Sequence, residues 1–308
     1  MLMEIVSHFI KKSIFLITHP KILLLSFVTH TPRLWSDKFY LQVLFRYYMG
    51  QTLNLKDPKS FSEKLQWLKL YNRKPEYTVM VDKIKAKDYV ASIIGKEHII
   101  PTIGVWDDPE KIDFDALPDR FVLKCNHNSG TGMYICKDKL KMDIKSVISG
   151  LRLGLKEDYF FRYREWPYKN VPRRILAEKY MEDESGELRD YKFFCFDGEV
   201  KALFIATDRS RGRNATRFDF FDENFNHLPF TNGHPNARVT LTKPRRFEEM
   251  KLLASKLSKG IAHVRIDFYE ICDQVYFGEI TFFHWAGLMP FKPKEWDYLF
   301  GQWIKLPE

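Results

Sequence analysis

The spacing of hydrophobic residues changes near residue 99, and this change restricts the fold more than any other feature of the sequence. Before that point apolar residues recur at helical spacing, and Ser60 with Glu63 forms a capping-box pattern. After it, short apolar runs alternate with turn residues, and Asp197-Gly198 between two such runs is typical of a β-hairpin. Helices, then mixed helices and strands, then antiparallel strands predict an α+β fold.

Turn and capping residues give approximate bounds to the expected elements. The expected helices are 36–50, capped by Ser36 and ended by Gly50, then a helix opening at Ser60, and 82–95, 143–155 and 246–257. The expected strands are 99–106, 120–124, 174–181, 190–196, 200–207, 217–221, 262–269 and 274–281. No internal repeat or flexible linker separates them.

The first 28 residues are rich in apolar side chains, but His19, Pro20 and Lys21 interrupt them. A membrane span needs about 20 apolar residues. A secretory signal would need a small-residue cleavage site, which does not follow. We expect two short helices that either pack on the core as an extension or lie on a membrane surface, helped by Lys11, Lys12 and Lys21.

The composition limits the class of protein and of partner. A chain of 308 residues, 45% hydrophobic and 29% charged, can bury a core in one or two domains, which excludes a disordered protein. Four cysteines without a C-x-x-C pair argue against a zinc site and favour reduced thiols in the cytoplasm. A formal charge of +9 favours an anionic partner: nucleotide phosphates, an acidic glycan, nucleic acid or an anionic membrane surface.

Lys124 ends an expected strand, and the small polar loop Asn126–Gly132 follows it. Glycines let backbone N–H groups approach an anion closely, and a lysine ammonium is a compact charge for phosphate. The loop fits neither the P-loop nor the dinucleotide fingerprint. It is therefore either a phosphate-binding loop or a plain turn between strands.

A second constellation lies on the last two expected strands. Alternation along a strand places Arg265 with Asp267 on one face, and Glu279 with Thr281 on one face. In an antiparallel pair the two carboxylates can meet, and Mg²⁺ would remove their repulsion and hold nucleotide phosphates. The alternative is a surface salt-bridge cluster of Arg265 with either acid.

Two further motifs are weaker. Residues 178–181 end an apolar strand, where main-chain groups could meet an adenine. The pattern Asp82-Lys83-x-x-x-Lys87 at a helix start would, alone, be a solvated helix face.

Taken in order, these segments resemble the ATP-grasp superfamily over residues 75–285. The matching segments are D-K-I-K-A-K (82–87), I-P (100–101), F-V-L-K (121–124), A-E-K-Y (177–180), R-I-D (265–267) and G-E-I-T (278–281). The chain is similar in particular to the TupA-like ATP-grasp proteins of bacterial cell-surface polysaccharide gene clusters. That likeness is carried by 61–71, 124–130, 190–198, 276–282, Ala286-Gly287 and 290–293.

The resemblance implies a fold and a role for each matching residue. It implies two α+β subdomains clasping ATP, with a helical extension at 1–75, an ATP-grasp domain at 76–308, a nucleotide subdomain near 110–185 and a metal-site subdomain near 186–308. ATP phosphates would be contacted by Lys87 and Lys124 under a loop containing Ser129, Gly130, Thr131 and Gly132. The adenine would be met by Glu178, Lys179 and Tyr180, and the ribose by Asp190. Mg²⁺ would be bound by Asp267, Glu279 and Thr281, where the family often has Asn in place of this threonine. Catalysis would fall to Arg265 and Lys124.

The expected function is an ATP-dependent carboxylate–amine ligase that forms an amide through an acylphosphate in surface polysaccharide biosynthesis, such as that of a capsule or a teichuronopeptide-like polymer. A glycosyltransferase of the same pathway is the alternative. A non-catalytic binder of acidic glycan or nucleic acid is the third reading, but the basic-aromatic motif of an RNA-binding domain is missing, so no nucleic-acid partner is expected.

The acceptor has its own candidate residues. Arg209 and Arg211 lie in an arginine-rich segment between two expected strands and, with Lys192, would hold a carboxylate-bearing small molecule or glycan. A solvated basic loop is the alternative. We expect a cytoplasmic protein, with peripheral contact at the inner face of the membrane as an option for the apolar N-terminus.

Overall fold

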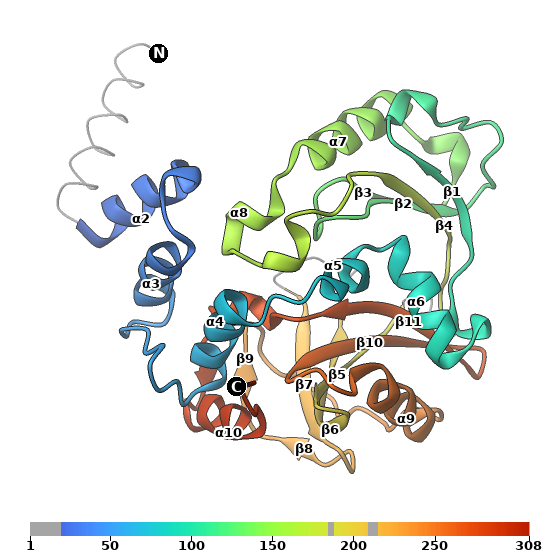
Figure 1. The fold of residues 1–308 in the computed structure, drawn as a ribbon. Coiled ribbons are helices and arrows are strands. Elements are labelled where there is room, and N and C mark those ends of the chain that lie inside the picture. Colours follow the sequence, from blue (N-terminus) through green and yellow to red (C-terminus); the bar gives the residue numbers. More distant parts are fainter. Residues whose placement is uncertain (1–19, 184–187, 209–214, 308) are drawn as a thin grey trace.

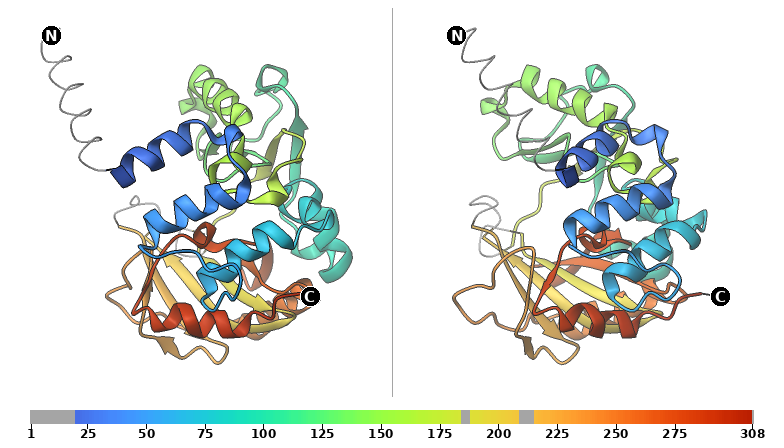
Figure 2. Two further views of the ribbon diagram at one scale, coloured as in Figure 1. Left: turned by 60° about the vertical axis from the view of Figure 1, so that its left-hand side comes forward. Right: turned by 90° about the vertical axis from the view of Figure 1, so that its left-hand side faces the viewer.

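The computed structural model describes residues 20–183, 188–208 and 215–307. Two β-sheets, each with its own helices, lie one above the other in Figure 1, with α5 (Glu76–Val81) and α6 (Lys85–Ile94) between them. Helices α2 (Pro20–His30), α3 (Asp37–Tyr48) and α4 (Phe61–Tyr71) follow one another along one side of the molecule (Figure 2). The predicted α+β fold class is confirmed.

The smaller sheet is antiparallel and has the strand order β1-β4-β2-β3. Its strands are β1 (Thr102–Trp106), β2 (Phe121–Cys125), β3 (Met133–Cys136) and β4 (Ile175–Lys179). Helix α7 (Ile144–Lys156), capped by the Asp143 side chain, packs on it and shares its hydrophobic core. Strand β3 was not predicted, because it is only four residues long and half of it is exposed.

The larger sheet has the strand order β11-β10-β5-β6-β7-β8. Its strands are β5 (Asp190–Phe196), β6 (Glu199–Thr207), β7 (Arg217–Asp222), β8 (His227–Leu228), β10 (Val264–Ile271) and β11 (Gln274–Thr281). Asp197 and Gly198 both have positive φ angles, as a tight two-residue hairpin turn requires, so the predicted β5–β6 hairpin is confirmed. A separate two-stranded sheet pairs β9 (Thr231–Asn232) with β12 (Phe291–Lys292).

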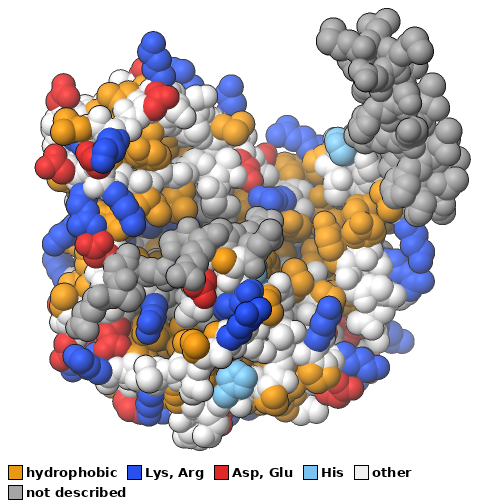
Figure 3. Space-filling model, turned by 180° about the vertical axis from the view of Figure 1, so that it is seen from behind, with side chains coloured by type: hydrophobic (Ala, Val, Ile, Leu, Met, Phe, Trp, Pro, Cys, Tyr) orange, Lys and Arg blue, Asp and Glu red, His pale blue; other side chains and the backbone are white. Residues whose placement is uncertain are grey.

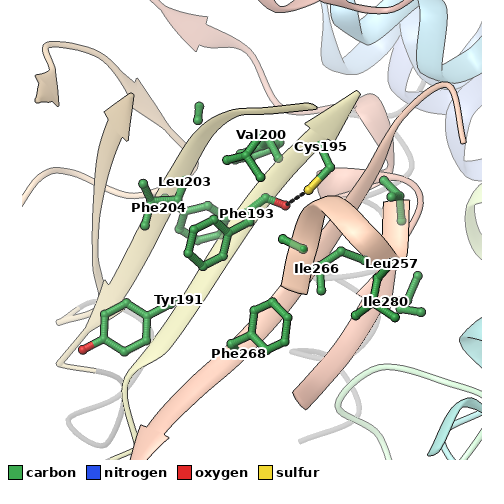
Figure 4. Packing of buried hydrophobic residues seen from close by; sticks show 14 of the residues in the cluster. Tyr191, Phe193, Cys195, Val200, Leu203, Phe204, Leu257, Ile266, Phe268 and Ile280 are labelled. Atoms are coloured by element: carbon green, nitrogen blue, oxygen red, sulfur yellow. Dashed lines mark hydrogen bonds between the residues drawn. The ribbon is translucent and has the colours of Figure 1, made fainter. Parts of the chain in front are cut away.

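Both faces of β5 are covered by helices, which explains its nearly continuous apolar sequence. Phe193 lies on one face against Phe247 of α9 (Phe247–Ser258). Figure 4 shows this face, with the buried side chains of β5, β6 and β10 packed under the helix. Phe194 lies on the other face against Phe61 of α4 and Phe300 of α10. The sheet is therefore a central layer rather than an edge of the fold.

The predicted helix caps are confirmed where the structure tests them. Ser36 accepts a hydrogen bond from the backbone N–H of Phe39 at the start of α3, and Ser60 and Glu63 form the capping box of α4. The remaining helices of the described chain are α2 (Pro20–His30), α3 (Asp37–Tyr48), α4 (Phe61–Tyr71), α5 (Glu76–Val81), α6 (Lys85–Ile94), α8 (Tyr159–Tyr163) and α10 (Glu295–Trp303).

The N-terminal helices share a small core that is separate from those of the two sheets. Val28 of α2 and Leu44 of α3 belong to it, together with Leu288 near the C-terminus. Of the two predicted N-terminal helices, the second is present as α2, and the first lies outside the described residues. Among the residues that the structure describes, no helix is long and apolar enough to cross a membrane.

Helices α4, α5 and α6 share the core of the larger sheet, although they precede the smaller sheet in the sequence. The core of the larger sheet is therefore formed by two stretches of the sequence, one before and one after the strands of the smaller sheet. The domain boundaries expected at residues 75 and 185 stay a prediction.

Candidate functional site

A pocket lies where the two sheets approach each other. Its polar wall consists of Lys83, Lys87, Lys124, Tyr168, Glu178 and Glu279, and its apolar wall includes Met80, Val81, Ile99, Ile100, Phe277 and Ile280. The residues come from β2 and β4 of the smaller sheet, from α5, α6 and the turn between them, and from β11 of the larger sheet. A few convergent charges beside an apolar wall are typical of a small-molecule site.

Two lysines of this pocket clamp one carboxylate. Lys87 Nζ lies 2.6 Å from one oxygen of Glu178, and Lys124 Nζ lies 2.5 Å from the other. Burial alone would raise the pKa of Glu178, but the two ammonium groups outweigh it and hold that pKa below its usual value. Two cations facing one anion leave a net positive charge, which suits an anionic ligand.

Lys83 is a third cation of the pocket, and the sequence analysis assigned no role to it. Its Nζ donates to the backbone carbonyl of Asn128 at 2.5 Å, and burial lowers its pKa while Glu279 opposes that shift. Lys83 lies four residues before Lys87, in the turn that leads into α6, and both side chains line the pocket. That spacing, read together with Lys124, was the signal that could have found it.

The loop after Lys124 is anchored at its base and open at its tip. Asn126 donates to Asp82 Oδ1 at 2.8 Å and accepts from the backbone N–H of Arg174 at the same distance. Gly132 has φ +71°, and a Cβ there would lie 2.7 Å from Cys125 Sγ. A side chain at Gly132 would therefore separate the loop from α7. Ser129 and Gly130 at the tip are exposed, so they can meet a ligand.

Six polar side chains gather on one face of the larger sheet. In β10 and β11, Asp267 lies opposite Glu279, and Arg265 lies opposite Thr281. Asp267 is also paired with Lys192 on β5, and Asp190 precedes Lys192 by two residues on the same face. The predicted meeting of the two carboxylates on the last hairpin is confirmed.

Arg265 holds this cluster together. Its Nε and Nη2 donate to the two oxygens of Asp267 at 2.7 and 2.8 Å. Nη2 also reaches Glu279 Oε1 at 3.3 Å and the hydroxyl of Thr281 at 3.1 Å. The guanidinium is therefore fixed by acceptors on both strands.

A buried histidine supports Arg265 from behind. Arg265 Nη1 lies 3.0 Å from His284 Nδ1, and His284 Nε2 lies 3.0 Å from Asn232 Oδ1. An arginine can only donate, so Nδ1 must accept, and Nε2 must carry the proton that it donates to Asn232. Burial, with Arg265 beside it, holds the pKa of His284 well below its usual value. His284 is thus a neutral positioning group.

The charge balance of the cluster corrects one step of the sequence argument. The sequence predicts two facing carboxylates with no cation to balance them, but in the structure Arg265 and Lys192 both contact Asp267. The Lys192 ammonium contacts Asp267 directly and lies 3.3 Å from Asp190. The carboxylates are therefore compensated without a metal ion, and a cation is not required merely to relieve their repulsion.

Glu279 is the acid of the cluster that opens to the pocket. Its side chain is 39% exposed, although protein atoms surround it. Burial raises its pKa, but Lys192, Lys83, Arg265 and Lys124 together outweigh burial and lower the pKa to about 2. Glu279 is ionised at neutral pH.

The donor set fits a magnesium ion bound mainly by oxygen atoms. Within residues 20–183, 188–208 and 215–307, no group of three or more His, Cys, Asp or Glu side chains could hold a metal ion. Two facing carboxylates and a hydroxyl remain, and Mg²⁺ commonly takes one or two carboxylates together with phosphate oxygens and water. Glu279 is accessible to such an ion, whereas Asp267 would have to exchange its contact with Lys192.

The structure places the other predicted residues in different surroundings. Asp190 is buried beside Lys192. Lys179 is exposed, and Tyr180 lies under the guanidinium of Arg120 at 4.1 Å. Arg209 and Arg211 lie outside the described residues. The roles of all the predicted site residues in binding ATP, metal or acceptor stay predictions.

The sequence matches a family model described as TupA-like ATPgrasp over residues 63–305. This match covers most of α4, both sheets and α10, and so includes every polar residue of the pocket. No curated protein is similar enough in sequence to match the chain.

Several solved structures share parts of the arrangement at low sequence identity. D-alanine–D-alanine ligase from Helicobacter pylori is 14% identical with a TM-score of 0.46, over 80% of this chain and 70% of that one. The same enzyme from Bacillus anthracis, complexed with ATP, is 18% identical with a TM-score of 0.38, over 66% of this chain and 55% of that one. The ATP-grasp ligase PsnB, complexed with a precursor variant, Mg and ADP, is 11% identical with a TM-score of 0.36, over 72% of this chain and 56% of that one. The chain thus spans little more than half the length of the last two.

Proposed function

Because the chain belongs to the TupA-like ATP-grasp family, we propose that it is an ATP-dependent ligase that joins a carboxylate to an amine. One observation carries this proposal. Lys83, Lys87 and Lys124 converge on a pocket that also contains Glu279, which is in contact with Arg265. The lysines can neutralise a polyphosphate, and Glu279 can help to hold a cation.

The proposed reaction has two steps. A carboxylate oxygen of the acceptor attacks the γ-phosphorus of ATP, the bond to the bridging oxygen breaks, and ADP leaves. The nitrogen of a neutral amine then attacks the acylphosphate carbon, phosphate leaves with the bonding electrons, and the nitrogen loses a proton as the amide forms. Little covalent chemistry is asked of the protein in the first step, so positioning and charge neutralisation would dominate catalysis.

The residues divide between these tasks by their place in the pocket. Lys87 and Lys124 would bind the phosphates beneath the 126–132 loop, because both ammonium groups lie at Glu178 in the pocket and Lys124 ends the strand that leads into the loop. The apolar side chains around Ile100 and Ile280 would take the adenine. Arg265 would steady the transferred phosphoryl group, since its guanidinium is already fixed. Mg²⁺, held by Asp267 and Glu279, would supply further neutralisation of phosphate charge.

The proposed setting is cell-surface polysaccharide synthesis, on the cytoplasmic side where ATP is available. There the carboxylate would be a uronic acid and the amine an amino acid. Arg209 and Arg211 are proposed to hold the acidic acceptor, because arginine suits carboxylates. Lys192 was assigned to the same task, but its ammonium is already engaged by Asp190 and Asp267. It would serve an acceptor only after leaving one of them.

The test is ATP-dependent product formation with candidate pairs of uronic acids and amino acids. ADP release that needs the carboxylate, together with a hydroxamate when hydroxylamine replaces the amine, would support an acylphosphate. Lys124→Ala should lose both signals, and Lys145→Ala on the exposed face of α7 is the matched control. Release of a nucleoside diphosphate from a sugar donor without ATP consumption would contradict the proposal and favour the glycosyltransferase alternative.

A further inference from the structure

The N-terminal helices carry an unusual concentration of exposed apolar side chains. Five of them, each between 38% and 73% exposed, are Leu23, Leu24, Phe27, Leu34 and Phe39. They define what we call the α2–α3 platform. Isolated exposed apolar residues are normal on a protein, but a contiguous group of large ones marks an interaction surface.

The platform is continuous across the two helices. On α2, Leu23, Leu24 and Phe27 share the exposed stripe, while Val28 of the same helix is buried against α3. The ring of Phe27 contacts Trp35 at 5.7 Å, and Trp35 contacts Phe39 of α3 at 5.0 Å. Figure 3 shows one side of this region at the upper right, where hydrophobic side chains lie close to basic ones.

The charged side chains within the segment that forms the platform are almost all positive, and Asp158, an acid that faces it from another segment, is paired with Arg33 at 3.2 Å. Between residues 20 and 56, five lysines and arginines accompany a single acid, Asp37. That acid is not available to a partner, because Arg73 and Arg164 hold it at 2.7 and 3.0 Å. The platform therefore presents an apolar, partly aromatic surface with a basic rim, which is the composition of interfacial helices on anionic lipid.

The platform is fixed to the rest of the molecule rather than loosely attached. Arg164 is fully buried, pairs with Asp37 at the start of α3, donates to the carbonyls of Pro32 and Trp35, and lies 4.0 Å over the ring of Tyr40. Four residues later, Tyr168 lines the polar pocket. A surface that binds the platform would consequently fix the orientation of the pocket as well.

We propose that the α2–α3 platform docks onto an anionic lipid bilayer. A second copy of the chain is a poorer occupant, because a two-fold contact would bring the same basic rim of each copy face to face, while the neighbouring acids Asp37 and Asp158 are already paired with arginines. The proposal does not depend on the ligase activity. It adds a place of action, a membrane surface.

The test is cosedimentation of the full chain with vesicles. Wild type should bind vesicles of phosphatidylcholine with phosphatidylglycerol, and binding should fall with salt and be weak on phosphatidylcholine alone. Leu24→Gln with Phe27→Gln should weaken binding by about tenfold or more, since both side chains would enter the lipid. Lys21→Glu with Lys38→Glu should remove the preference for anionic vesicles.

The matched control is Leu153→Gln with Leu252→Gln, which removes two apolar side chains that are more than half exposed on α7 and α9. It should bind as wild type does, and melting curves should show that all variants fold. Wild-type binding by the Leu24/Phe27 variant would overturn the proposal and place any lipid contact elsewhere. A dimer that the same variant dissociates, with no vesicle binding by wild type, would overturn it in favour of self-association.

Discussion

The two polar clusters of the pocket are built in opposite ways. On the smaller sheet, Lys87 and Lys124 share the single carboxylate of Glu178, and cations are in excess. On the larger sheet, Arg265 and Lys192 meet several acids, and each polar atom of the Arg265 guanidinium has an acceptor. The first cluster, which we call the lysine cluster, has more cations than anions. In the second, which we call the arginine cluster, every guanidinium nitrogen of Arg265 already has an acceptor.

This difference indicates which cluster a ligand would change. A polyphosphate would add the negative charge that the lysine cluster lacks, so it could bind there without displacing an internal partner. Any cation entering the second cluster must compete with Lys192 for Asp267. We therefore expect nucleotide binding to depend mainly on the lysine cluster, and turnover to depend mainly on the arginine cluster.

The largest expected effect comes from the acids of the arginine cluster. Asp267→Asn with Glu279→Gln should abolish Mg²⁺-dependent ADP formation, with a loss of about a thousandfold or more, because several kcal/mol of transition-state stabilisation disappear. Glu279→Gln alone should lose most of this activity and keep its fold, since Glu279 is the more exposed acid. The measurement is the steady-state rate at saturating ATP and Mg²⁺.

Stability must be measured alongside, because Asp267 is fully buried between two cations. Removing one partner of such a group costs about 3–5 kcal/mol, so the double variant should melt earlier than Glu279→Gln. Glu270→Gln, also on β10, is the control and should keep full activity. An active, folded Glu279→Gln variant would show that the arginine cluster is structural.

The lysine cluster should show the converse behaviour. Lys124→Ala should weaken ATP binding by about 10- to 100-fold, the worth of a charged hydrogen bond, and should keep its fold because Glu178 retains Lys87. Lys124→Arg should not restore affinity, since a planar guanidinium differs in shape from an ammonium. Calorimetry with a non-hydrolysable ATP analogue measures both; equal affinity in wild type and Lys124→Ala would make the lysine structural.

A variant of His284 tests whether the arginine cluster can be disturbed without affecting nucleotide binding at the lysine cluster. His284→Phe keeps a ring among Phe194 and Phe204 but leaves Arg265 Nη1 without its acceptor. We expect kcat to fall by about 5- to 50-fold, as for a lost buried hydrogen bond, while ATP affinity changes little. A fall in ATP affinity with unchanged kcat would instead assign His284 to the nucleotide side.

His98→Phe is the matched control for this prediction. His98 is also buried, and its Nδ1 contacts the backbone carbonyl of Val275 on β11. Val275 lies at the opposite end of β11 from Thr281, the partner of Arg265, so replacing His98 should leave kcat close to that of wild type. Equal losses in both variants would point to a general effect of disturbing β11.

The sequence predicted the β10–β11 part of the arginine cluster, but not the contacts of His284 and Asn232 behind it. Alternation along a strand was enough to place Arg265 and Asp267 opposite Glu279 and Thr281, because the two strands are joined by a short turn. The contact between His284 and Asn232 joins residues 52 positions apart through a two-stranded sheet of very short strands. No local spacing encodes which buried polar atoms meet over such a separation.

Other residues and strands were also predicted, but without their partners in the fold. Lys124 and Glu178 were each expected in the site, but their direct pairing follows from the register of β2 and β4, which the sequence does not specify. Strand β5 was predicted from its apolar run, but the covering of its two faces follows from tertiary packing, with α9 on one face and α4 and α10 on the other. Local patterns predicted elements, and tertiary contacts decided their partners.

The smallest expected effect concerns pH and a second buried histidine on the larger sheet. Burial lowers the pKa of His263 to about 3, so the folded protein does not take up a proton that the unfolded chain binds below about pH 6.5. The unfolded state then binds more protons, and stability must fall as pH falls from 6.5 to 5. The loss from this group should be about 1–2 kcal/mol over that window.

The comparison that isolates this effect is wild type against His263→Phe, whose ring can pack on Phe194 and Phe196. Glu165 acts in the opposite direction, because burial raises its pKa to about 7 and its contribution to stability is lost as pH rises. Since both proteins contain Glu165, the difference in their urea midpoints between pH 5 and 6.5 reports the histidine alone. The variant should show the shallower loss towards low pH; parallel midpoints would mean that His263 becomes protonated within the folded core.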